Sequence, residues 1–159
     1  MILVTVGTHS QGFDRLIKAM DQLAAEIDER VVIQRGSSTY LPQHAEHFQW
    51  TSSQQMEQLT DNARVVVAHA AAGAIILALR LGKPLVVVPR LRYYGEHFDD
   101  HQKQLAAAIA SQGRAIVIYD LDSAALRLVI EMATELRVIK GTSKSLAVAL
   151  RQQMNTWAD

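Results

Sequence analysis

The sequence predicts an α/β fold in which a mostly parallel sheet carries helices on both faces. Three observations support this prediction: short runs rich in Val and Ile alternate with amphipathic segments, small polar turns separate them, and neither a repeat nor a linker interrupts the alternation. Continuous apolar runs are typical of strands that are buried on both faces. Right-handed crossovers then join such strands into a doubly wound sheet.

The first half of the chain is expected to hold three strands and two helices. A continuous β-branched run predicts a strand at Ile2–Val6, and apolar residues at helical spacing predict a helix over Phe13–Glu29. Ser52 or Ser53 is a suitable N-cap for the second helix. The remaining elements are strands at Val31–Gln34 and, more weakly, near His47–Trp50, and a helix at Ser53–Asp61.

The second half continues the alternation. Apolar runs predict further strands, and Gly82 and Gly113 are expected to end the helices that precede them. The expected order is a strand at Val65–Ala68, a helix from Ala72 to Gly82, a strand at Leu85–Val88, a helix at Asp100–Ser111, a strand at Ala115–Tyr119, and two closing helices at Ser123–Glu135 and Ser143–Trp157. One domain spanning residues 1–159 accounts for all of these elements.

Composition excludes several classes of function. Lys plus Arg and Asp plus Glu each number 16, so no net field attracts nucleic acid or anionic lipid. The absence of Cys excludes disulfides and cysteine-based zinc or redox sites, and it fits a reducing, cytoplasmic location. No leader precedes the first strand, so the mature chain is expected to begin at Met1. No run reaches the roughly 18 apolar residues of a membrane span, so membrane contact is expected only at the periphery or through a partner.

A turn of small residues follows the strand at Val65–Ala68. His69, Ala71, Ala72 and Gly73 lie here, immediately before a helix whose free N–H groups and dipole suit a diphosphate. Small residues also serve tight packing of a helix on a sheet with no ligand, so both interpretations stay open.

The turn after the first strand contains Gly7, Thr8 and His9. It lacks the G-x-G-x-x-G pattern and the later acidic residue of dinucleotide-binding enzymes, and the chain has no ATPase phosphate loop. NAD, FAD and ATP are therefore not expected as cofactors. A ligand-contacting loop and ordinary turn chemistry, with Thr8 bonding local backbone, are both compatible with this segment.

A polar loop runs from Arg90 to Gln102. His97, Asp100 and His101 stand at helical spacing within it, which is compatible with zinc. In the interpretation placed first, the histidines sit on a solvated rim and an Asp caps the next helix. Second comes a clamp in which Arg90 or Arg92 and His97 donate to anionic sugar-phosphate oxygens. Metal binding comes third, so no metal site is expected.

Three segments resemble the C-terminal domain of glycosyltransferase family 28: VTVGTHSQGFDRLIKAMDQL, AHAAAGAIILALRLGKPLVVVPR and EHFDDHQKQLA. They occur in order, and the resemblance extends from Met1 to about Tyr119. The chain looks most similar to the single-domain donor-binding subunits, such as the small subunit of the two-subunit dolichol-linked N-acetylglucosaminyltransferase and those of bacterial exopolysaccharide glycosyltransferase pairs.

The resemblance implies one Rossmann-like lobe of a GT-B enzyme that binds a UDP-sugar without an essential metal. It further implies that a separate, membrane-associated subunit binds the acceptor and carries the catalytic base, so no catalytic residue is assigned here. Gly7, Thr8 and His9 would face the cleft between the lobes, and Gln102 matches the family's donor-sugar glutamine. The full set of implied nucleotide-sugar contacts is Gly7, Thr8, His9, His69, Ala71, Ala72, Gly73, Arg90, His97, Asp100, His101 and Gln102.

The chain also departs from the family pattern. The family commonly reads H-x-G-x-G-[ST], where this chain has Ala71 and Ala74, and Leu77 replaces a Glu that usually meets the ribose. Two hypotheses follow. The first is a donor-binding subunit of an inverting two-subunit glycosyltransferase that acts on a lipid-linked acceptor in polysaccharide biosynthesis. The second is a non-catalytic accessory subunit of the same fold, which stabilises or activates a partner. The retained polar rim favours the first.

Overall fold

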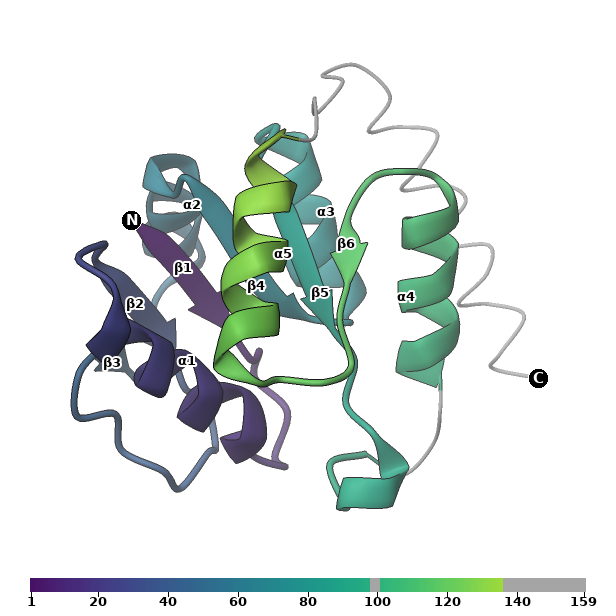
Figure 1. The fold of residues 1–159 in the computed structure, drawn as a ribbon. Helices are drawn as coiled ribbons and strands as arrows, with labels where there is room; N and C mark the ends of the chain where they lie inside the picture. Colours follow the sequence, from purple (N-terminus) through teal and green to yellow (C-terminus); the bar gives the residue numbers. More distant parts are fainter. Residues whose placement is uncertain (98–100, 136–159) are drawn as a thin grey trace.

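The computed structural model describes residues 1–97 and 101–135, and its centre is a six-stranded parallel sheet (Figure 1). The strand order is β3-β2-β1-β4-β5-β6, and every neighbouring pair is parallel. The strands are β1 (Ile2–Thr5), β2 (Val31–Gln34), β3 (Glu46–Phe48), β4 (Val65–His69), β5 (Leu85–Val88) and β6 (Ile116–Val117). The α/β class with a parallel sheet is therefore confirmed.

Helices cover both faces of the sheet (Figure 1). On one face, α1 (Asp14–Glu26) and α5 (Ser123–Glu135) pack against Val4 and Val67. On the other face, residues of α3 (Ala72–Arg80) and α4 (His101–Ser111) pack with Leu3 and Val66, alongside α2 (Ser53–Asn62). Because successive strand residues point to opposite faces, the β-branched runs supply both layers of the core.

A buried carboxylate fixes the long connection between β2 and β3. Asp21 of α1 is 1% exposed and accepts hydrogen bonds from the Tyr40 hydroxyl and from the backbone of Gln43, His44 and Ala45, at 2.7–2.9 Å. Burial by itself raises the pKa of Asp21, but these hydrogen bonds outweigh it and hold the pKa below its ordinary value. The connection delivers β3 to the edge of the sheet, just before Trp50.

The observed elements differ from the expected ones mainly at their ends. Val31–Gln34, Leu85–Val88 and Ser123–Glu135 match their predictions. The first helix stops at Glu26 rather than Glu29, because Ile27 is already extended where the chain turns into β2. The last strand shrinks to Ile116–Val117 from the expected Ala115–Tyr119. The expected helix at Ser143–Trp157 lies outside the described residues.

Among the described residues, no helix has the length and apolar character needed to cross a membrane.

Candidate functional site

The ends of β1 and β4 form the centre of the candidate site. These two strands are neighbours, with Thr5 in register with Ala68, and their carboxyl ends open on the same edge of the sheet. The chain leaves β1 toward β2 on one side, while β4 leads to β5 on the other. Such a point, where the direction of winding reverses, is where open α/β sheets bind ligands.

Gly7 lies at this point in a conformation that only glycine tolerates. Its φ is +75°, and a Cβ here would stand 2.5 Å from the Cε1 and Nε2 atoms of His69. Gln34 holds the loop: its Oε1 accepts from the Gly7 N–H at 3.1 Å and from the Thr5 hydroxyl at 2.7 Å, and its Nε2 donates to the Gly7 carbonyl at 2.9 Å. The Gly7 backbone is therefore held in place at the lining of the cavity.

His69 is buried against this loop. It is 6% exposed, and its Nδ1 lies 3.3 Å from the Thr5 carbonyl, which can only accept, so this contact places the proton on Nδ1. Burial, and then the positive charge of Arg90, lower the pKa of His69 to about 4. The imidazole is therefore neutral at pH 7.

The turn after His69 leaves the amino end of α3 open. The Ala71 N–H donates to the His69 carbonyl at 2.8 Å, which sets the sharp turn, and Ala71, the N-cap residue, has no side chain that could cap the helix. The neighbouring helix α2 differs, because the Ser52 hydroxyl accepts from the Gln55 N–H in a capping box. A Cβ on Gly73 would meet no atom within 4 Å, so the folded chain alone does not require glycine there.

A cavity of about 700 Å³ occupies the space between α2, α3 and the ends of β1 and β4. Five residues expected from the sequence line it: Gly7, Thr8, His69, Ala71 and Gly73. Further lining residues were not anticipated as contacts, among them Gln34, Trp50, Met56, Glu57 and Arg80. Two signals in the sequence could have found two of them. Trp50 ends a weakly predicted strand, which is compatible with an aromatic contact, and Gln34 is a polar residue that closes an otherwise apolar strand, which is compatible with a polar contact.

Leu77 and Ala74 also line this cavity. Leu77 is half-buried and stands outside both buried core clusters, so the helix position compared with the family's ribose-binding Glu does face the cavity.

The loop after β5 has a different character. Arg90 is 1% exposed, and its guanidinium donates to the carbonyls of Gly12 at 2.6 Å, Val6 at 3.0 Å and Glu96 at 3.4 Å. It also stacks over the Phe13 ring at 4.7 Å. Two of its nitrogens are thus engaged with backbone, and Arg90 acts here as a support of the loops. A direct contact between Arg90 and a ligand stays a prediction that this geometry does not favour.

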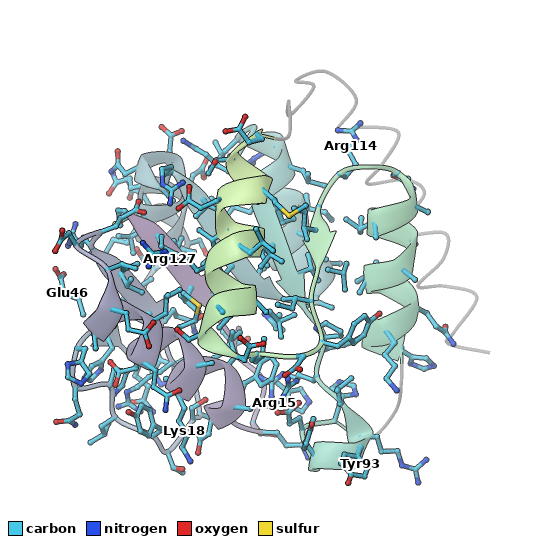
Figure 2. The ribbon with its side chains drawn as sticks, viewed as in Figure 1. Arg15, Lys18, Glu46, Tyr93, Arg114 and Arg127 are labelled. Carbon is cyan, nitrogen blue, oxygen red and sulfur yellow. The ribbon has the colours of Figure 1, made fainter. Side chains whose placement is uncertain are left out.

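Glu96 completes the internal bonding of that loop. Its carboxylate accepts two hydrogen bonds from Arg15, at 2.8 and 3.0 Å, and one from the Leu91 N–H at 3.0 Å. Figure 2 labels Arg15 on α1 and Tyr93 on the 3-10 helix η1 (Arg92–Tyr94), and Tyr93 is 90% exposed. This short helix was not anticipated from the sequence.

Most of the remaining expected contacts lie around the loop after β5. His9 and His97 bring their ring centroids to 5.6 Å, and the Gln102 Oε1 accepts from the Arg90 N–H at 3.0 Å. His101 begins α4, and Ala72 begins α3. Asp100 lies outside the described residues, so its spacing with the histidines is not tested. Within residues 1–97 and 101–135, no group of three or more His, Asp or Glu side chains is arranged to hold a metal ion.

Comparison with known proteins identifies the family of the chain and shows a shared fold. The chain matches the glycosyltransferase family 28 C-terminal domain over residues 1–145. Similar solved structures include the calicheamicin glycosyltransferase CalG4, with 22% identity and a TM-score of 0.66, covering 99% of this chain and 44% of that one. Another is ALG13 in solution, with 19% identity, a TM-score of 0.52, and 79% and 83% of the two chains covered.

A third is the glycosyltransferase VinC in complex with DTDP, with 19% identity, a TM-score of 0.57, and 97% and 37% of the two chains covered. At these identities the structures show a shared fold, which is one lobe of GT-B glycosyltransferases. The chain spans less than half the length of CalG4 and of VinC.

Proposed function

The chain belongs to the glycosyltransferase family 28 C-terminal domain family, and on this premise we propose that it binds the UDP-sugar donor of an inverting glycosyltransferase. One observation carries the proposal. The cavity of about 700 Å³ lies where the fixed Gly7 backbone meets the uncapped amino end of α3. Its volume is within the range of small-molecule sites.

The diphosphate is placed at the amino end of α3. Ala71, Gly73 and Ala74 keep side-chain bulk away from the N–H groups there, and the helix dipole favours an anion. No essential metal is needed in this arrangement, because fixed dipoles can neutralise a leaving diphosphate. VinC, which was solved with DTDP, has the same fold, and this supports a nucleoside diphosphate as the ligand.

The nucleobase of the donor is proposed to stack on Trp50. This residue is 48% exposed and lines the cavity, so part of its indole ring is accessible for stacking on a planar base. His9, His97 and Gln102 lie by the loop after β5 and are proposed to contact the sugar end of the donor. The role of Asp100 and His101 in this contact also remains a proposal.

We further propose that the catalytic base and the acceptor site belong to a second, membrane-associated subunit. His69 is neutral and its Nδ1 is engaged with Thr5, and the carboxylate of Glu57 is paired with Arg80, so neither is placed as a free base. The acceptor is proposed to be lipid-linked, in polysaccharide biosynthesis, and the chain to be one domain that reaches the cytoplasmic face of the membrane through its partner.

Calorimetric titration with UDP and UDP-sugars tests the donor role. We expect Trp50→Ala to weaken UDP binding by about 1–3 kcal/mol, the contribution of stacking one base on an aromatic ring. Tyr93→Ala is the matched control, because Tyr93 is an exposed aromatic residue outside the cavity lining. Absence of binding by the chain, with and without its partner, refutes the donor role.

A sugar-transfer assay tests the division between subunits. The purified chain is expected to transfer no sugar alone and to support transfer when the partner is added. Turnover by the chain alone, at the rate of the pair, contradicts the divided site.

The accessory hypothesis is the second candidate, since the apolar Leu77 lines the cavity. It gains support if the partner turns over without donor binding by this chain.

A further inference from the structure

One carboxylate stands out on the wall of the cavity. Among the described residues that line it, Glu57 of α2 carries the only carboxylate, and Arg80 of α3 the only guanidinium. The Glu57 Oε1 lies 2.8 Å from the Arg80 Nη2 atom. The two side chains are 50% and 53% exposed, respectively, so the pair is accessible from the cavity and from solvent.

Counting residues along the two helices puts Glu57 and Leu77 at a similar distance from their helix starts. Both α2 and α3 follow the carboxyl end of a parallel strand, so they begin at the same edge of the sheet and run in the same direction. Glu57 lies four residues after Ser53, the first residue of α2, and Leu77 lies five residues after Ala72, the first of α3. At about 1.5 Å per residue, they are roughly 6 and 7.5 Å along their helices.

In the proposed binding mode, that level corresponds to the ribose. With the diphosphate at the start of α3, the ribose would lie about one helical turn further along the cavity, where the Leu77 side chain offers no hydrogen-bond acceptor. The facing wall does offer one. A carboxylate accepts from two neighbouring hydroxyl groups at once, because each oxygen has two lone-pair sites.

We propose that Glu57 binds the vicinal hydroxyl groups of the donor's ribose, and that Arg80 is a positioning residue which orients its carboxylate. This rests on the proposed function, since it names a contact within the same site. An exposed ion pair contributes little to stability, so the hydroxyl groups compete for Glu57 mainly with water. Glu57 then makes the site selective for ribonucleotides over deoxyribonucleotides.

Titration with UDP and 2′-deoxy-UDP tests this selectivity. The wild-type chain is expected to bind UDP at least about tenfold more tightly than 2′-deoxy-UDP, because UDP makes one more hydrogen bond to a charged group. Glu57→Ala should weaken UDP binding more than binding of 2′-deoxy-UDP, which has only the 3′-hydroxyl left to lose its acceptor, so the ratio approaches one. Arg80→Gln should lower the ratio only in part, because it frees the carboxylate without removing it.

Asp61→Ala is the matched control. Asp61 lies one turn further along α2 and pairs with Lys83 at 3.4 Å, but it does not line the cavity, so this variant should keep the wild-type ratio. Thermal melting checks that each variant folds. If the wild-type chain binds UDP and Glu57→Ala keeps the full ratio, the inference is overturned and the proposed function stands. If the wild-type chain binds neither nucleotide, both fail together.

Discussion

The cavity between α2 and α3 and the loop after β5 lie at the same edge of the sheet, yet they use their polar groups in opposite ways. In the loop, Arg90 and Glu96 are buried. The Nη1 and Nη2 atoms of Arg90 donate to backbone carbonyls, and the Glu96 carboxylate accepts from Arg15. Around the cavity, the helix end is uncapped by side chains and Trp50 is 48% exposed.

A cluster of polar residues in a sequence therefore does not by itself identify a ligand site. The segment from Arg90 to Gln102 is dense in charged and polar residues, and part of it supports the molecule internally. The segment from Ala70 to Ala74 has no polar side chain at all. It is the stronger candidate because small side chains leave backbone N–H groups open to an anion.

Replacing Arg90 is expected to cause the largest loss of stability among the variants considered at this edge of the sheet. A small loss would contradict the conclusion that Arg90 supports the loop after β5. Arg90→Met removes the donors to Val6, Gly12 and Glu96 and leaves their carbonyls without these partners. The free energy of unfolding should fall by about 3–5 kcal/mol, measured by urea denaturation. Arg90→Lys should lose less, because it keeps a charge but not the planar fork. Stability within about 1 kcal/mol of wild type in Arg90→Met would show that the loop does not depend on this side chain.

Gly7→Ala probes the floor of the cavity. The positive φ and the approach to His69 should together cost about 2–4 kcal/mol of unfolding free energy. Gly113→Ala is the control: its φ is +63°, but a Cβ there meets no atom within 4 Å, so only the backbone cost of about 1 kcal/mol is expected. Equal losses in the two variants would mean that the contact with His69 is unimportant.

Lowering the pH tests the contribution of the buried His69 imidazole to stability. The folded state disfavours protonated His69, so the unfolded chain binds the proton more readily between the ordinary pKa of 6.5 and the folded pKa of about 4. Stability is therefore full above about pH 6.5 and falls as the pH drops toward 4, by up to about 3 kcal/mol. The difference between wild type and His69→Gln, from urea denaturation at pH 7, 6 and 5, should show this slope.

The carboxylates do not obscure the effect of His69 in that range. The pKa of Glu29 is lowered to about 2 from 4.5, mainly by hydrogen bonding to Arg64, so its contribution is lost only below about pH 4.5. Asp14 and Asp21 also have lowered pKa values and lose their contributions below their ordinary 3.8. A wild-type slope that persists in His69→Gln between pH 7 and 5 would assign it to another group.

Leu77→Glu tests whether a carboxylate on α3 can contact a nucleotide in the cavity. Because Leu77 lines the cavity and is half-buried, the variant is expected to fold, and in a Glu57→Ala chain, where the ribose hydroxyls lack their proposed acceptor, it should tighten UDP binding by about 1.5–3 kcal/mol. Leu79→Glu is a useful contrast, because Leu79 is 6% exposed in the core and an unpaired charge there should unfold the domain. Unchanged or weaker UDP binding when Leu77→Glu is added to the folded Glu57→Ala chain would show that a carboxylate from α3 does not reach the nucleotide.

The elements were predictable where the pattern was local and strong. Leu85–Val88 is a continuous apolar strand, and Ser123–Glu135 shows helical periodicity throughout. Ends were less predictable, because Ile27 would fit a helix as well as an extended residue and only the start of β2 decides between them. The small-residue turn at His69 was also visible from the sequence, whereas Trp50 and Glu57 were not identified as parts of the same cavity.

The sequence by itself determined the alternation of strands and helices and the family to which the chain belongs, because apolar periodicity and short motifs are properties of neighbouring residues. Tertiary structure alone decided which distant residues meet. Gln34 holds Gly7 across 27 positions, Arg90 reaches Val6 across 84, and Glu57 pairs with Arg80 on another helix. The physical reason is that a polar side chain is satisfied by whichever group the fold places beside it, and strand order, rather than local pattern, sets that placement.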